Sequence, residues 1–263
     1  MIPGLQMRVV LRDRSLTDVL DLTFRFMSKH FWLHLKVALV VLVPAYALCV
    51  WLGAEVNWAV GWTAALLLGS LAQGPFTMLA SKLVFQEHAT AREALFSALH
   101  AFPRLALARF FQALSLLVSA LLCVVPIFFT GPLFLFLPEI VLLEGVGFSQ
   151  GASRARALAL NHTGNAFSAW MLLTIARMGS VLAIGDVAGR QLVQTMLSVS
   201  PPESMFTSGG NYLAMAGFWI FVPFCADARF FIYLNLRTKV EGWDIQARFL
   251  ALTLRAREGA EAR

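Results

Sequence analysis

Six runs of about twenty predominantly apolar residues limit the folds open to this chain more than any other feature. A helix of about 20 residues crosses the roughly 30 Å hydrocarbon core of a bilayer. Because 59% of the residues are hydrophobic and only 14% are charged, a water-soluble core could not bury them all. The sequence therefore predicts an all-α, polytopic integral membrane protein with about six transmembrane helices. The predicted spans are residues 34–53, 58–80, 106–125, 127–145, 165–187 and 212–236.

Basic residues flank these runs and predict the orientation of the chain. Lys and Arg gather before the first span, in the second and fourth connections and after the last span, whereas the first and third connections contain none. Under the positive-inside rule, both termini and the even connections face the cytoplasm. The net charge of +6 is thus explained by membrane topology, and no nucleic-acid partner is expected. The sequence has 17 Arg but only 4 Lys. Such an excess of arginine is typical of a GC-rich bacterium, so we expect a bacterial cytoplasmic (inner) membrane.

An amphipathic helix at the cytoplasmic surface is predicted before each pair of spans. The chain is then one membrane domain, residues 1–237, built from three pseudo-repeats of interfacial helix plus hairpin. Their bounds are about 1–85, 86–148 and 149–237. These helices either form a sensing or docking surface or merely guide the chain into each hairpin, and we favour guidance. Capping-box spacing marks two of the three helix starts; the capping residues are Ser15, Thr90 and, for the third helix, Ser149 or Ser153.

Two groups of residues are predicted at the membrane interface. Arg25, Lys29 and Trp32 belong to the first amphipathic segment and the start of the first span. Arg248 and Arg255 belong to residues 238–263, a basic amphipathic cytoplasmic tail. The expected partners are the lipid bilayer and its anionic headgroups. The tail could instead bind a cytoplasmic protein, but we favour lipid.

Charged residues inside the spans are the strongest candidates for a site. A central Arg or Asp costs about 2.5–3.5 kcal/mol to insert, so such residues face the bundle interior and are paired. Counting 1.5 Å per residue from the cytoplasmic ends places Arg177 about 18 Å deep and Asp227 about 15 Å deep, which predicts one pair. Glu139 and Arg229 come out near 9 and 12 Å, which predicts a second pair. Gln73 lies at a similar level and would extend this polar cluster.

The predicted cluster has two interpretations. It is either a polar site in the inner half of the bundle, for a lipid headgroup, a small anion or a relayed proton, or two ion pairs that fix how the hairpins pack. We favour packing.

Residue patterns typical of enzymes are missing from the sequence. His30 and His34 have the i, i+4 spacing of a helical zinc site, but no Glu stands between them as a metalloprotease requires. Cys49, Cys123 and Cys225 lie in separate apolar runs without a C-x-x-C partner, and no P-loop is present. We therefore expect no catalytic residues, no metal and no cofactor.

Three parts of the sequence carry a resemblance to a known family. They are Leu16–Arg25 with Lys29–Phe31, Pro138–Gly145 with Ala152–Arg156, and Phe230–Arg237 with Glu241–Asp244. They resemble the bacterial membrane-domain family found attached to glycerophosphoryl diester phosphodiesterases, which also occurs as stand-alone multi-span proteins. The resemblance implies a membrane fold and location. It carries over no catalytic residue, because the phosphodiesterase barrel is absent.

Two functions remain open from the sequence. The first is a non-enzymatic scaffold or regulatory subunit of a bacterial membrane complex, which would have a membrane or cytoplasmic protein partner. The alternative is a transporter or lipid-handling protein that uses the polar site in the inner half of the bundle.

Overall fold

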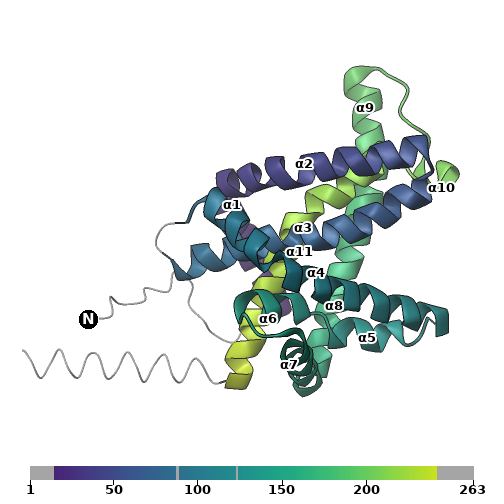
Figure 1. Ribbon diagram of the computed structural model, residues 1–263. Coiled ribbons are helices and arrows are strands. Elements are labelled where there is room, and N and C mark those ends of the chain that lie inside the picture. The colour runs from purple at the N-terminus through teal and green to yellow at the C-terminus, as the bar shows by residue number, and fades with distance from the viewer. Residues whose placement is uncertain (1–14, 87–88, 123, 242–263) are drawn as a thin grey trace, which may run out of the picture.

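The computed structural model is described here for residues 15–86, 89–122 and 124–241, and these ranges contain helices and no strand (Figure 1). The helices follow one another in a single bundle. Their bounds are α1 Leu16–Lys29, α2 Phe31–Glu55, α3 Trp58–Phe85, α4 Ala91–Leu122, α5 Ile127–Leu133, α6 Leu137–Leu143, α7 Phe148–Asn161, α8 Thr163–Gly179, the π-helix η1 Ser180–Ala188, α9 Gly189–Leu197, α10 Met205–Ser208 and α11 Tyr212–Glu241.

Five helices in the described part of the chain are long and apolar enough to cross a membrane. They are α2, α3, α4, the continuous run Thr163–Leu197 formed by α8, η1 and α9, and α11. The predicted apolar runs at these places are therefore confirmed as long helices. Large apolar side chains such as Leu39, Leu121 and Ile220 are exposed on them. Lipid tails would surround such residues, so the helices indicate a multi-pass membrane protein.

The predicted fourth span, residues 127–145, is not one helix. It forms α5 and α6, each of seven residues, with a turn between them at Phe134–Phe136. Pro126 stands directly before this segment, and Pro132 and Pro138 lie within it. Each proline lacks a backbone N–H and disfavours the helical conformation of the residue before it. Seven residues extend only about 10 Å along a helix, so neither piece could cross a bilayer alone.

Helix α11 forms the centre of the bundle. In its most apolar window 78% of the residues are buried, compared with 22% for α2 and for α4. It packs against η1, α3, α1 and α2, and Figure 1 shows it running through the middle of the fold. Its start lies near α9 and α10, and its later part packs against α1. We call the two ends of the bundle the α9 end and the α1 end.

The first predicted interfacial helix, α1, begins where the sequence predicts. Ser15 caps α1 as predicted: its Oγ accepts from the Asp18 N–H at 3.2 Å, and its own N–H donates to the Asp18 carboxylate at 3.4 Å. The exposed positions of Arg25, Lys29 and Trp32 fit an interface. The predicted tail residues Arg248 and Arg255 lie outside the described residues.

The other two predicted interfacial helices differ from expectation. Thr90 does accept from the Glu93 N–H at 3.2 Å, but the helix continues through Pro103 to Leu122, so interfacial segment and span are one helix. Helix α7 starts after Gly147, and neither Ser149 nor Ser153 caps it.

Two glycines bring η1 against α11. A Cβ on Gly185 would lie 2.6 Å from the Leu213 carbonyl oxygen, and one on Gly217 would lie 2.9 Å from the Gly185 Cα. No side chain fits at such distances, so the two backbones touch. Beyond this contact, the buried Asp186 carboxylate fixes the α9-end loop, accepting from Ser204 Oγ at 2.9 Å, Met205 N at 3.1 Å and Asn211 Nδ2 at 2.6 Å.

Candidate functional site

The predicted pair between Glu139 and Arg229 is present. Arg229, on α11, donates from Nε to Glu139 Oε1 at 2.8 Å and from Nη2 to the same oxygen. Glu139, on α6, is fully buried and Arg229 is 6% exposed. The second carboxylate oxygen, Oε2, is buried without a hydrogen-bond partner. The Glu139 carboxylate therefore reaches Arg229 even though a turn separates α5 from α6.

The predicted pair between Arg177 and Asp227 is wrong. Asp227 Oδ2 lies 2.8 Å from His34 Nε2, whereas the Arg177 guanidinium lies 5.4 Å from the centre of the Phe218 ring. Phe218 precedes Asp227 by nine residues, about 13 Å along α11. The depth counted from the span ends did not predict this, because α11 packs more extensively against η1 than against α8, and η1 lies toward the α9 end.

Gln73 belongs to a buried polar cluster as predicted, but its partner is Arg109. Arg109 Nη2 donates to Gln73 Oε1 at 3.0 Å, and Nη1 donates to Gln112 Oε1 at 2.9 Å. Arg109 interacts electrostatically with Arg229 and Glu139, so these residues form one cluster. Arg109 was not predicted to join the cluster because it stands near the start of a predicted span. The one available signal was Gln112, one helical turn later.

His34 was not predicted to join the cluster, since its sequence pattern was only the i, i+4 spacing with His30. Its imidazole is 4% exposed and links α2 to the fully buried Asp227 on α11. We call His34, Gln73, Arg109, Glu139, Asp227 and Arg229 the buried polar cluster. Among the described residues, no three His, Cys, Asp or Glu side chains are grouped so as to hold a metal ion.

A second polar group lies nearer the α1 end, around Glu144. Its carboxylate accepts from the Tyr233 hydroxyl at 2.7 Å, lies 3.4 Å from the Arg237 guanidinium and pairs with Arg154. Arg104, on α4, donates to the neighbouring Gly145 carbonyl at 3.1 Å. These contacts join α4, α6, α7 and α11, so we assign the group a role in packing.

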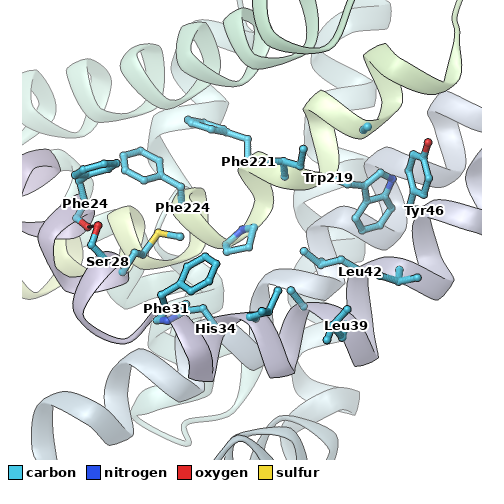
Figure 2. Close-up of a pocket in the computed structure, with 17 residues that line it drawn as sticks. Phe24, Ser28, Phe31, His34, Leu39, Leu42, Tyr46, Trp219, Phe221 and Phe224 are labelled. Carbon is cyan, nitrogen blue, oxygen red and sulfur yellow. Dashed lines mark hydrogen bonds between the residues drawn. The ribbon is translucent and has the colours of Figure 1, made fainter. Parts of the chain in front are cut away.

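A groove runs between α1, α2 and α11, and His34 of the buried polar cluster lines it (Figure 2). Its volume is about 670 Å³, and its walls are almost entirely apolar. His34 lies in its lining toward the α1 end, and Tyr46 and Trp219 line it toward the α9 end. Tyr46 donates to the Tyr212 carbonyl at 3.1 Å, whereas the buried Trp219 Nε1 has no hydrogen-bond partner. The apolar lining includes Phe24, Phe31, Leu39, Leu42, Phe221 and Phe224.

Comparison with protein-family models, with curated proteins and with solved structures finds no match to this chain. The resemblance to the phosphodiesterase membrane domain therefore stays a prediction.

Proposed function

We propose that the protein is a non-enzymatic, lipid-handling protein of a bacterial cytoplasmic membrane, with the α1 end and both termini on the cytoplasmic side. The groove between α1, α2 and α11 carries this proposal. Two of its walls, α2 and α11, are candidate membrane spans, so the groove lies at the level of the hydrocarbon. An apolar groove at that level takes a lipid chain, since lipid tails are the surrounding medium.

The length of the groove fits a membrane lipid. It extends along α2 from Phe31 to Tyr46, fifteen residues or about 22 Å. One leaflet contributes about half of the roughly 30 Å core. A chain entering from the α1 end would therefore be enclosed by protein over the whole depth of its leaflet.

The test is purification in mild detergent and mass spectrometry of the lipids that remain bound. Ala38→Phe places a ring in the groove, whereas Ala47→Phe makes the same change at an exposed position of α2 outside it. The proposal expects Ala38→Phe to lose retained lipid and Ala47→Phe to keep it. Equal retention in the unaltered protein and both variants would contradict it.

One observation, the exposure of α9, favours the scaffold function. No residue of this helix is buried, and Leu192, Met196 and Leu197 are exposed at its tip. A protein partner at the α9 end would cover them. A stoichiometric partner that co-purifies with the native protein, and is lost on Met196→Asp, would support this second function. Purification without a partner would count against it.

A further inference from the structure

The His34 imidazole makes two short contacts, one with the His30 carbonyl and one with Asp227, and each contact needs a proton. His34 Nδ1 lies 3.0 Å from the His30 carbonyl oxygen, which only accepts, so Nδ1 carries a hydrogen in that contact. His34 Nε2 lies 2.8 Å from Asp227 Oδ2. With Nδ1 protonated, a neutral imidazole and a carboxylate would present two lone pairs to each other. One further proton is therefore held between Nε2 and Oδ2.

The pair with both protons is neutral overall. It is either an imidazolium with a carboxylate or an imidazole with a carboxylic acid, and both forms satisfy both contacts. Removing one proton breaks one of the contacts, whichever ring tautomer remains, and leaves a net negative charge. Asp227 is fully buried and its Oδ1 has no partner, so that charge would be poorly compensated.

Apolar rings surround the imidazole. Phe26 of α1 and Phe76 of α3 lie with their ring centres 6.0 and 6.2 Å from it. The electrostatic partner of Asp227 is His34, while Arg109 interacts with Arg229, Glu139 and Arg177. Arg229 is balanced by Glu139. Other Asp, Glu, His, Lys and Arg residues lie on the elements that pack against α2 or α11. They are Asp18, Asp21, Arg25 and Lys29 on α1, His30 between α1 and α2, Lys36 and Glu55 on α2, Lys82 on α3, Arg92, Glu93, His100 and Arg104 on α4, Arg154 and Arg156 on α7, Asp186 on η1, Arg190 on α9, and Arg237 and Lys239 on α11.

Both residues of the pair are buried, and the groove is the open space beside His34. His34 lines it, and Asp227 lies behind His34. An empty groove that admits water to the imidazole solvates the charged, deprotonated pair. A lipid chain in the groove excludes that water and so favours the neutral, protonated pair.

We propose that His34 and Asp227 form a proton-binding site linked to the groove, so that a lipid chain binds together with one proton. The inference rests on the proposed lipid function and adds its regulation. By reciprocity, acidification tightens lipid binding to the same extent that lipid tightens proton binding. Where one proton is taken up, affinity rises by up to about tenfold for each pH unit lowered.

Proton uptake by the unaltered protein is the direct test. Lipid-free full-length protein in weakly buffered detergent is mixed with phosphatidylglycerol, and a pH-sensitive dye reports the protons bound. The inference expects uptake approaching one proton per lipid bound. Lipid binding without proton uptake, measured between about pH 5 and 8 where a histidine titrates, would overturn it.

Variants then locate the proton. Asp227→Asn keeps a neutral side chain whose amide can donate to His34 Nε2, so this variant should bind lipid with an affinity independent of pH. His30→Gln is the matched control: it removes a neighbouring histidine outside the groove lining but keeps the His30 carbonyl, and should leave the pH dependence intact. Loss of the pH dependence in His30→Gln, or its persistence in Asp227→Asn, would contradict the assignment.

The two proposals fail in different ways. If no lipid is retained at any pH, the lipid function itself is wrong. If lipid binds, Ala38→Phe blocks it and affinity does not change with pH, only the proton linkage is wrong.

Discussion

The Asp227 carboxylate lies 2.8 Å from the His34 imidazole although 193 residues separate them in the chain. This contact joins the first long helix to the last, and its His34 side lines the groove. It also takes the place of the pair that the sequence predicts for Asp227.

We expect the effects of neutralising Arg177 and Asp227 to be independent. Because Arg177 contacts Phe218 and Asp227 contacts His34, the double variant Arg177→Met/Asp227→Asn should show the sum of the single effects within about 0.5 kcal/mol. Thermal unfolding of the four proteins in detergent measures this. Recovery of stability in the double variant would mean that the two residues interact after all.

Breaking the Glu139–Arg229 pair should be costly. Arg229→Met leaves a fully buried carboxylate without its cation. We expect the free energy of unfolding to fall by about 3–5 kcal/mol, or the yield of folded protein to fall. The double variant Glu139→Gln/Arg229→Met removes both charges and should recover part of it. Arg92→Met, at an exposed site, controls for loss of an arginine. An Arg229→Met protein as stable as this control would show that the pair contributes little.

The contact between η1 and α11 should tolerate no methyl group. Gly217→Ala would place its Cβ 2.9 Å from Gly185 Cα, so the two helices must separate, at a cost of about 1–3 kcal/mol. Gly179→Ala, with no atom within 4 Å of the new Cβ, should be neutral or stabilising, since alanine favours a helix more than glycine does. Similar melting temperatures for the two variants would argue against direct contact of the backbones.

Labelling from one side of the membrane should give the orientation. Gln194, on α9, and Arg156, on α7, are both exposed. In a protein without its native cysteines, Gln194→Cys should react with an impermeant maleimide on intact spheroplasts, and Arg156→Cys only after permeabilisation. The opposite pattern would reverse the proposed topology.

Much of the architecture follows from local sequence. The five long helices come from apolar runs, and the start of α1 comes from the capping box at Ser15. The Glu139–Arg229 pair could be predicted because both residues lie a short distance from the same end of the bundle. The break in the predicted fourth span could not be predicted in the same way, because a count of apolar residues takes no account of how Pro126, Pro132 and Pro138 interrupt a helix.

The buried polar cluster was predictable only in outline. Depth along a span does not say which face of a helix a residue occupies, so it could not separate Phe218 from Asp227 as the neighbour of Arg177. His34 and Arg109 stand near span ends, where polar residues are ordinary. Only the packing of α2 and α4 against the core turns them inward.

Photo-crosslinking tests the central claim most directly. Phosphatidylglycerol with a diazirine near the end of one acyl chain is incorporated into membranes that contain the full-length protein, and the labelled peptides are identified by mass spectrometry. We expect labels to concentrate on groove residues of α2 and α11, such as Leu42, Val43 and Trp219, and to fall in Ala38→Phe. Labelling no stronger there than on exposed Leu117 and Leu121 of α4 would mean that the groove holds no lipid of its own.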